Sequence, residues 1–216
     1  MTRPLLLIGN KNYSSWSLRP WLLMKQAGID FDERVIPLYN DASRQEILRH
    51  SPSGKLPCLI DGDLKVWDSL AICETVAESL PQLWPSDAVA RAHARALSAE
   101  MHSGFTALRT RLPMNIRADL AGKCIEIDAE RDIARIVEAW TECRSRYGAQ
   151  GLFLFGTFGV ADAMFAPVCF RFHIYGVPLP DAAARYRDTM LALPAMQQWA
   201  ADARVEPWSL PQFEVG

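Results

Sequence analysis

The segment SPSGKLPCLIDGDLKVWDS, residues 51–69, contains the signals that decide the fold of the first part of the chain. A loop rich in Ser, Pro and Gly precedes two short apolar runs, and Asp61-Gly62 joins these runs. Asp-Gly between apolar runs is a strong hairpin signal, because the tight turns that suit twisted strands need residues that tolerate positive φ. We therefore predict that residues 57–60 and 64–67 pair as antiparallel strands, and that a helix begins at Ser69.

Strand-like and helix-like patterns alternate upstream of this hairpin. PLLLIG, residues 4–9, is a short apolar run that is typical of a buried central strand. DERVIPL, residues 32–38, also reads as a strand, and its Pro37 places it at a sheet edge because proline cannot donate to a ladder. A helix is expected from Leu18 to Gln26 with Ser17 as its cap, and a short one over residues 41–49. The predicted order is β-α-β-α-β-β-α.

The second half of the chain has a different pattern. LPQLWPSDA, residues 80–88, contains two prolines and resembles a linker. Beyond it we predict one helix over residues 88–112 that ends before Pro113, a second over 128–147 that ends at Gly148, a third near 159–168 and a last one that starts at Pro194. The predicted domains are an α/β domain at 1–81, a linker at 82–87 and an all-α helical bundle at 88–216.

Composition excludes several classes of function. The 216 residues carry a net charge of −2, so there is no basic excess for nucleic-acid binding. No apolar run approaches the roughly 18 residues of a membrane span, and the N-terminus lacks the apolar core of a signal peptide. The five cysteines and four histidines form no CxxC or HxxxH pair, so neither a disulfide framework nor a metal site is predicted. We expect a cytoplasmic protein that does not contact membranes.

Three polar stretches are expected to converge where strands end and helices begin, which is where open α/β sheets bind ligands. They are the loop with Tyr13, Ser14 and Ser15, the SGKLP loop at residues 53–57, and the turn with Asp68 and Ser69. A helix N-terminus at Ser69 offers backbone N–H groups to a carboxylate, and Asp68 would accept from an ammonium, so this turn suits an α-amino acid head group. The alternative is that Ser69 only caps the helix while Asp68 complements its dipole.

The motifs in this order resemble the cytosolic glutathione transferase family. The matching segments are SSWSLR, SPSGKLPCLIDGD, WDSLAICETVAE and GVADAMFAPV, and the resemblance covers nearly all of the chain. It implies a thioredoxin-like N-terminal domain, an all-helical C-terminal domain and a homodimer. It also implies glutathione as co-substrate, without a metal. The Ser-Ser pair ahead of Ser-x-Arg is similar to the serine-type classes, the zeta class in particular.

The resemblance also implies a role for each matching residue. Ser14 would donate a hydrogen bond to the glutathione thiolate, and Ser15 would be a second donor or the alternative activator. Leu56, ahead of a cis Pro57, would pair through its backbone with the cysteinyl part of glutathione. Asp68 and Ser69 would hold the γ-glutamyl ammonium and carboxylate. Lys55 would reach the glycyl carboxylate.

Physical chemistry agrees with such a role for a serine hydroxyl. A free thiol has a pKa near 8.5, so about a few per cent is thiolate at pH 7. A hydroxyl that donates to sulfur, and the positive end of a helix, both stabilise the thiolate over the thiol. The serine is then a donor to a nucleophile that belongs to the bound tripeptide.

The sequence departs from the family pattern at two positions, and one neighbouring residue adds an alternative. Trp16 stands where zeta-type sequences usually carry Cys, which suggests a bulky wall at the second substrate site. Gly159 stands where the family usually places Ser or Thr three residues before the Asp of the helical half, here Asp162. Tyr13 lies beside the serines, and other classes activate the thiol with Tyr.

The electrophile site is expected between the two halves. Met101, His102, Phe105 and Arg109 recur there at helical spacing and, with Trp16, are candidate pocket residues. Met and Phe at such spacing also suit a plain hydrophobic core. The leading hypothesis is conjugation of glutathione to a small electrophile, as in detoxification. The alternatives are a glutathione-dependent cis-trans isomerase, similar to maleylacetoacetate isomerase, and a non-catalytic binding or dimerisation module.

Overall fold

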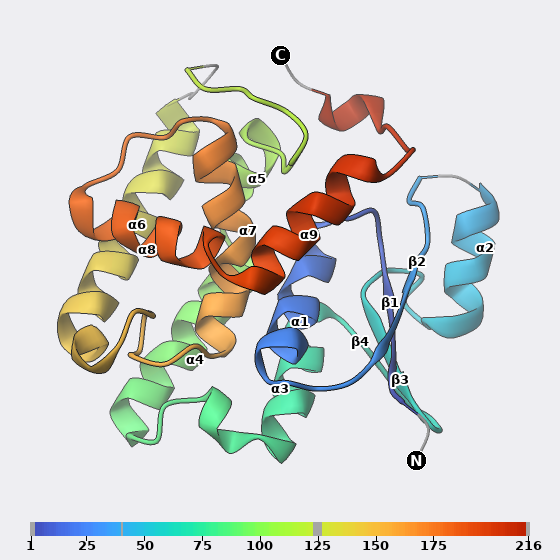
Figure 1. The fold of residues 1–216 in the computed structure, drawn as a ribbon, viewed down its shortest axis with the longest axis horizontal. Coiled ribbons are helices and arrows are strands. Elements are labelled where there is room, and N and C mark those ends of the chain that lie inside the picture. The colour runs from blue at the N-terminus through green and yellow to red at the C-terminus, as the bar shows by residue number, and fades with distance from the viewer. Residues whose placement is uncertain (1–2, 40, 123–126, 215–216) are drawn as a thin grey trace.

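A four-stranded sheet with helices on both faces forms the N-terminal half of the molecule (Figure 1). The computed structural model describes residues 3–39, 41–122 and 127–214. The elements of this half are β1 (Leu5–Ile8), α1 (Ser15–Gln26), β2 (Asp32–Val35), α2 (Asp41–His50), β3 (Cys58–Asp61), β4 (Leu64–Trp67) and α3 (Ser69–Ser79). The predicted β-α-β-α-β-β-α order is confirmed.

The strands lie in the order β2-β1-β3-β4, with β1 parallel to β2 and β3 antiparallel to both of its neighbours. β2 is an edge strand, as Pro37 predicts. The hairpin forms with Cys58 opposite Trp67 and Asp61 opposite Leu64. β3 therefore starts one residue later than predicted, because Pro57 has no N–H to donate to the ladder.

Alternate residues of β1 point to opposite faces of the sheet, and the side chains on both faces are buried. Leu6 and Ile8 join the large core that includes α1 and α3. Leu7 packs instead with Ile36, Ile47 and Cys58 beneath α2. Figure 1 shows the result: α2 covers one face of the sheet, while α1 and α3 lie between the other face and the helical half.

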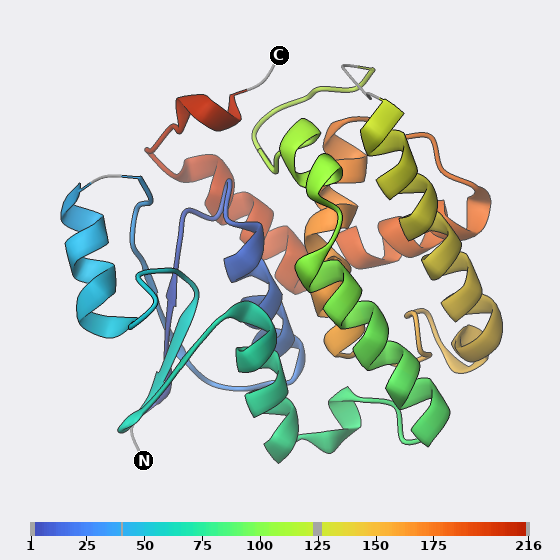
Figure 2. The ribbon, with the colours of Figure 1, turned by 180° about the vertical axis from the view of Figure 1, so that it is seen from behind.

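The C-terminal half is built from helices, with isolated β-bridges between residues 153 and 157 (Figure 2). Its helices are α4 (Ala88–Ser103), α5 (Thr106–Arg111), α6 (Ile127–Tyr147), α7 (Val160–Ile174), α8 (Asp181–Leu191) and α9 (Pro194–Val205), and short 3₁₀ turns lie at Pro81–Leu83, Gly148–Gln150 and Pro211–Phe213. Helix α7 is buried over almost its whole length and packs against α1 and α4. A helix that is apolar on all sides is typical of a central core position.

Two predictions for this half are wrong. The single helix over 88–112 is interrupted, because Gly104 is extended and Phe105 adopts the left-handed conformation with φ of 59°. Helix α8 was not predicted; its buried residues are Ala183, Tyr186 and Met190, and the charged and alanine-rich remainder gives only a weak apolar pattern. The first error matters for function, because it separates Met101 and His102 from Arg109.

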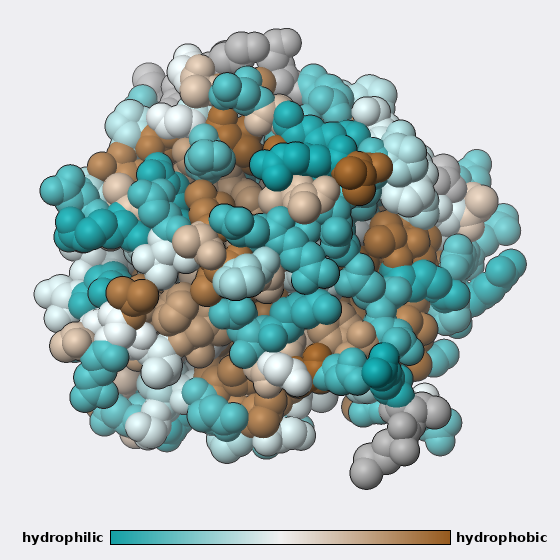
Figure 3. Space-filling view, in the orientation of Figure 1, coloured by the Kyte–Doolittle hydropathy of each residue, from teal (hydrophilic) through white to brown (hydrophobic). Residues whose placement is uncertain are grey.

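Hydrophilic side chains cover much of the face shown in Figure 3, and smaller hydrophobic patches lie among them. Across the residues that the structure describes, no helix combines the length and the apolar character needed to cross a membrane. Cys58, Cys73, Cys143 and Cys169 are free and buried; Cys124 lies outside the described residues.

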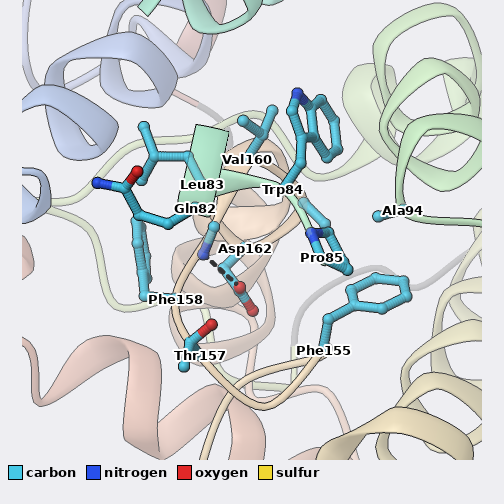
Figure 4. Close-up of a pocket in the computed structure, with 12 residues that line it drawn as sticks. Gln82, Leu83, Trp84, Pro85, Ala94, Phe155, Thr157, Phe158, Val160 and Asp162 are labelled. Atoms are coloured by element: carbon cyan, nitrogen blue, oxygen red, sulfur yellow. Dashed lines mark hydrogen bonds between the residues drawn. The ribbon is translucent and has the colours of Figure 1, made fainter. Parts of the chain in front are cut away.

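The chain after α3 docks against the N-terminus of α7, where a hollow of about 10 Å³ is large enough for roughly one water molecule (Figure 4). Asp162 organises this junction: its carboxylate accepts from the N–H of Gly159 at 3.0 Å, the N–H of Leu154 at 3.0 Å and the hydroxyl of Tyr186 at 2.9 Å. The hollow is lined mainly by apolar side chains, so we assign it a structural role.

The glycine at position 159 has a steric cause in this junction. Its φ of −152° is accessible to any residue, but a Cβ there would lie 2.5 Å from the carbonyl oxygen of Leu83. Real Cβ atoms essentially never come so close to a backbone oxygen. The close approach of the linker therefore excludes the serine or threonine that the family pattern favours.

We predict that Gly159→Ser destabilises the protein even though serine is the better helix cap in general. The Cβ clash should outweigh the new cap and lower the free energy of unfolding by about 1–3 kcal/mol, the range for overpacking. Denaturant unfolding of Gly159→Ser and Gly159→Ala measures this. An increase in the stability of the serine variant would contradict the steric explanation.

We also predict a pH dependence of stability from Asp162. Burial raises its pKa to about 6, although its hydrogen bonds with Leu154, Gly159 and Tyr186 oppose the shift. In the unfolded chain its pKa is about 3.9. Between these values the folded state binds more protons than the unfolded state, so this group makes stability fall as pH rises from about 4 to 6. Unfolding curves across this range should show a shallower fall for Asp162→Asn; an unchanged slope would refute the assignment.

Candidate functional site

A cleft of about 900 Å³ opens where α1, α2, α3 and α4 meet the loop before β3. It brings together most of the residues that the sequence predicts for a ligand site. The lining residues are Ser14, Trp16, Leu38, Tyr39, Asp41, Arg44, Ile47, Ser53, Gly54, Lys55, Leu56, Pro57, Trp67, Asp68, Ser69 and His102. A volume of this size is in the usual range for a small-molecule site.

Ser14 lies at the start of α1 and is its N-cap. The helix begins at Ser15, three residues earlier than predicted, and the hydroxyl of Ser14 accepts from the N–H of Ser17 at 3.3 Å. The prediction that Ser17 caps this helix is therefore wrong. Ser17 is fully buried, and its hydroxyl accepts from the N–H of Gly9 at 3.0 Å and from the hydroxyl of Ser14 at 2.8 Å. These contacts tie the start of α1 to the end of β1.

Ser15 is adjacent to Ser14 but is placed differently. It is buried and is not among the residues that line the cleft. Ser14 is also 6 % exposed, yet it contributes to the wall of the cleft. Of the two serines, the geometry favours Ser14 as a contact for a ligand.

Asp68, and not Ser69, is the N-cap of α3. One carboxylate oxygen of Asp68, Oδ1, accepts from the N–H groups of Leu70 at 2.9 Å and Ala71 at 3.3 Å. Two of the N–H groups that a bare helix end would offer are thus already paired. Within the described residues, the N–H of Ser69 and its hydroxyl remain as donors for an anion, and the hydroxyl has a long 3.5 Å contact with Nη1 of Arg19.

Asp68 adopts a φ of 79°, which is unusual for a residue other than glycine. Such a conformation costs on the order of 1–3 kcal/mol and persists where surrounding contacts enforce it. Here the two capping bonds and the contact of its second oxygen, Oδ2, with Nε2 of His102 at 3.2 Å do so. The strained residue faces the cleft, as strained residues at ligand sites often do.

The loop before β3 supplies the third wall. The Leu56–Pro57 peptide is cis, as the resemblance implies. Among the described residues, neither the N–H nor the C=O of Leu56 has a hydrogen-bond partner, and the same holds for the Lys55 ammonium, which is exposed. One unpaired backbone N–H, one unpaired C=O and one cation are therefore available at this wall.

His102 is the contribution of the helical half to the cleft. Burial lowers its pKa, with Arg19 and Arg109 acting in the same direction, while the neighbouring Asp68 carboxylate opposes the shift. Its ring meets the ring of Trp16 edge-on, with the centroids 5.3 Å apart. His102 and Trp16 thus form a continuous wall between the two halves of the chain.

Trp16 is held in place by cations. Its ring lies 4.4 Å from the guanidinium carbon of Arg19 and 4.7 Å from that of Arg109. Arg19 is wholly buried and Arg109 is largely buried, so both guanidinium groups are shielded from water. Cation–π contacts are stronger when the cation is desolvated. The indole is 36 % exposed, so a fixed aromatic surface faces the open side.

The other candidate pocket residues do not line the cleft. Met101 and Phe105 belong to the main hydrophobic core. Arg109, on α5, donates to the carbonyl oxygens of Gly104 and Met101 and so satisfies the C-terminal end of α4. The four residues do not form one helical row, because the break at Gly104 and Phe105 turns the chain.

Tyr13 points away from the cleft. Its hydroxyl accepts from the N–H of Leu210 at 3.2 Å and from Nη2 of Arg117 at 2.7 Å, and it donates to the carboxylate of Glu214. The phenol is thus fully committed to the C-terminal segment. The alternative in which Tyr13 activates a thiol has no geometric support.

Several residues around the site carry no local signal in the sequence. Glu206 and Asn115 contact the loop before Ser14 across more than 100 residues of chain, so no motif could have revealed them. Tyr39, Arg44 and Trp67 also line the cleft. Their place in it depends on how α2 and β4 pack, which the sequence near them does not reveal. Among the described residues, no group of three or more His, Cys, Asp or Glu side chains is placed to hold a metal ion.

Several known proteins are similar to this chain. A curated relative in Arabidopsis thaliana, glutathione S-transferase Z2, is 28 % identical over 203 residues, covering 87 % of this chain and 88 % of that protein. A probable maleylacetoacetate isomerase of Caenorhabditis elegans is 30 % identical, but the match spans 49 % of this chain and only 50 % of the nematode protein.

The fold has close structural neighbours. The crystal structure of a Burkholderia glutathione transferase homologue with bound glutathione superposes with a TM-score of 0.70 at 24 % identity, covering 95 % of this chain and all of that one. Residues 13–79 match the family model of the glutathione S-transferase N-terminal domain, and residues 126–202 match that of the C-terminal domain. With both domain models matched in this order, the chain belongs to the glutathione S-transferase family.

Proposed function

We propose that this protein is a glutathione transferase that binds glutathione in the 900 Å³ cleft and activates its thiol with the hydroxyl of Ser14. One observation carries the proposal. Ser14, at the N-terminus of α1, lines the same cleft as Lys55, Leu56, Asp68 and Ser69. A hydroxyl donor and groups that match both ends of a γ-glutamyl tripeptide thus share one cavity.

The polar groups of the cleft suit the parts of glutathione in order. The N–H and hydroxyl of Ser69 would receive the γ-glutamyl carboxylate, and the exposed carboxylate of Asp68 would receive the ammonium. The unpaired N–H and C=O of Leu56 would pair with the cysteinyl unit as a short stretch of β-ladder. Lys55 would attract the glycyl carboxylate. The bound glutathione in the Burkholderia neighbour supports this ligand class.

Thiol activation needs the hydrogen of Ser14 to turn from Ser17 to the sulfur. The arrangement allows this without the loss of a hydrogen bond. Ser17 accepts from the N–H of Gly9, so its own hydroxyl hydrogen is available to point back at Ser14. The chain Gly9 N–H, Ser17 O–H, Ser14 O–H would then end on the thiolate, and each donor in such a chain polarises the next.

The chemical step follows from the thiolate. The thiol proton leaves to solvent, and the sulfur attacks an electrophilic carbon of the second substrate to form a C–S bond. In a substitution the leaving group departs with its bonding electrons; in an addition the π bond breaks and the neighbouring carbon takes up a proton from solvent. Ser14 stays protonated throughout and acts as a donor. Trp16 and His102 would form the wall against which a small electrophile lies.

A second candidate function is glutathione-dependent isomerisation. The similarity to the probable maleylacetoacetate isomerase, which extends over about half of the chain, supports it. Isomerisation regenerates glutathione, whereas conjugation consumes it, so product analysis separates the two. A non-catalytic module is the third candidate, and lack of turnover in spite of glutathione binding would support it. We also expect a homodimer, which sedimentation analysis would detect.

We predict that Ser14→Ala raises the thiol pKa of bound glutathione towards the value of free glutathione, while Ser15→Ala leaves this pKa nearly unchanged. The loss of one hydrogen bond to a charged sulfur corresponds to about 1–2 pKa units. Turnover at neutral pH should fall by about 10- to 100-fold. The thiolate absorbance of the bound tripeptide across pH reports the pKa in both variants.

This comparison also decides between the two serines. The Ser14 variant loses the N-cap of α1, so its folding is checked by circular dichroism before the titration. If the thiol pKa of bound glutathione equals the wild-type value in Ser14→Ala but is raised in Ser15→Ala, the role belongs to Ser15. Unchanged values in both variants would reject serine activation.

For Ser69→Ala we predict weaker glutathione binding, by roughly tenfold, because a charge-assisted hydrogen bond to the carboxylate is lost. Ser79→Ala, at the exposed end of the same helix, is the matched control and should bind normally. Calorimetric titration with glutathione measures both. At saturation the Ser69 variant should keep the wild-type thiol pKa, and wild-type affinity in it would remove Ser69 from the binding site.

A further inference from the structure

The turn that precedes Ser14 is polar and yet almost completely buried. Asn10, Lys11, Asn12 and Tyr13 have side chains that are at most 6 % exposed. Buried polar groups need hydrogen-bond partners, because an unsatisfied one costs about 1–3 kcal/mol. Glu33 and the N–H of Leu38 bind side chains of this turn from the N-terminal half. Among the described residues, its other side-chain partners, including every other carboxylate, come from the C-terminal half.

Glu206, directly after α9, binds the apex of the turn. Its Oε1 accepts from the N–H of Lys11 at 2.6 Å, and its Oε2 accepts from the N–H of Asn12 at 3.0 Å. One carboxylate thus takes two consecutive backbone donors, which is the charge-assisted, two-point arrangement that fixes geometry best. Figures 1 and 2 both show the end of α9 beside the loop that leads from β1 into α1.

The same turn closes on itself directly before α1. The N–H groups of Tyr13 and Ser14 both donate to the carbonyl oxygen of Asn10, at 3.2 and 2.8 Å. Lys11 and Asn12 are the residues in between, so the two amides that Glu206 holds lie within the turn that ends at Ser14. The apex and Ser14 therefore belong to one hydrogen-bonded turn.

Further contacts hold the sides of the turn. The side chain of Asn12 donates to Asn115 at 2.7 Å and accepts from the N–H of Arg117 at 3.0 Å. The ammonium of Lys11 pairs with Glu33 at 2.5 Å and with Asp202 on α9 at 2.6 Å. Trp199 and the N–H of Ile116 each bind one carbonyl oxygen of the apex, those of Lys11 and Asn12. Glu206 binds both amides of these two residues with a single carboxylate.

We propose that Glu206 is a positioning residue for Ser14, and that its carboxylate sets the direction of the thiol-activating hydroxyl by fixing the Lys11 and Asn12 amides. This inference rests on the proposed function of Ser14. Glu206 itself does not line the cleft and would not touch glutathione. The C-terminal segment would therefore control how well the thiol is ionised, and not how well the tripeptide binds.

Glu206→Gln tests this inference. The side-chain amide keeps one acceptor but places an NH₂ group against a backbone N–H, so one of the two bonds is lost. The matched control is Glu142→Gln. Glu142 is an exposed carboxylate on α6 and, among the described residues, pairs only with Arg146. Hydrogen exchange of the Lys11 and Asn12 amides without glutathione reports directly on the turn.

The expected result is about tenfold faster exchange of these amides in Glu206→Gln, with exchange elsewhere unchanged. With glutathione, we expect a rise of about one unit in the pKa of the bound thiol, a fall of about tenfold in kcat at neutral pH and an unchanged dissociation constant for glutathione. The Glu142→Gln protein should match the wild type in every measurement.

A wild-type thiol pKa in Glu206→Gln, with faster exchange of the turn, would overturn the inference, because the turn would then move without consequence for Ser14. A weaker affinity for glutathione at unchanged thiol pKa would also overturn it. If Glu206→Gln does not fold, Glu206→Asp replaces it; the shorter side chain cannot reach both amides, and the same shifts are expected. Absence of a glutathione thiolate in the wild type would refute the proposed function instead, so the two failures are distinguishable.

Discussion

The structure depends on the burial of α1 on all sides. Leu18, Trp21, Leu22 and Leu23 are inaccessible to water, and so is the side chain of Arg19. This helix packs against α3 and α7 and shares its core with Leu6 and Ile8 of β1, so neither half of the chain covers it alone. Burying such side chains stabilises a fold by about 1.5–3 kcal/mol each. The two halves are therefore one packed unit around α1, and the N-terminus of this helix lies where they meet.

That position explains why so many polar groups gather around Ser14. A helix N-terminus at a buried junction leaves N–H groups that need partners. Ser14 accepts from one of them, the N–H of Ser17. The buried turn before the helix is paired at long range: Glu206 accepts from the Lys11 and Asn12 amides, and Glu214 and Arg117 contact the Tyr13 hydroxyl. These contacts fix the turn that leads to Ser14 at the wall of the cleft. Under the proposed function, a donor held in one place is what stabilisation of a developing charge requires.

Residues that depart from the family pattern have specific neighbours in this chain. Gly159 leaves room for the carbonyl oxygen of Leu83, so the linker can approach α7 more closely than a serine would permit. Trp16 lies against Arg19, Arg109 and His102, so the cleft has an aromatic wall fixed by three neighbours. In both places a substitution that looks like a loss in the sequence is matched by a contact that only the folded chain contains.

Several features could be predicted from the sequence: the element order of the N-terminal half, the hairpin at Asp61-Gly62, the edge position of β2 and the helical nature of the second half. These features follow from short-range patterns of apolar residues, glycine and proline, which act over a few residues. The sequence also marked Ser14, Lys55, Leu56, Asp68 and Ser69, because helix starts and loops have local signatures. The tertiary structure alone decided which serine caps α1, that α4 and α5 are separate helices, that Tyr13 faces the C-terminal segment and that Glu206 binds the turn before Ser14. The reason is physical: these outcomes depend on contacts between residues far apart in the chain, and a hydrogen bond from Lys11 to Glu206 leaves no trace in the sequence near either residue.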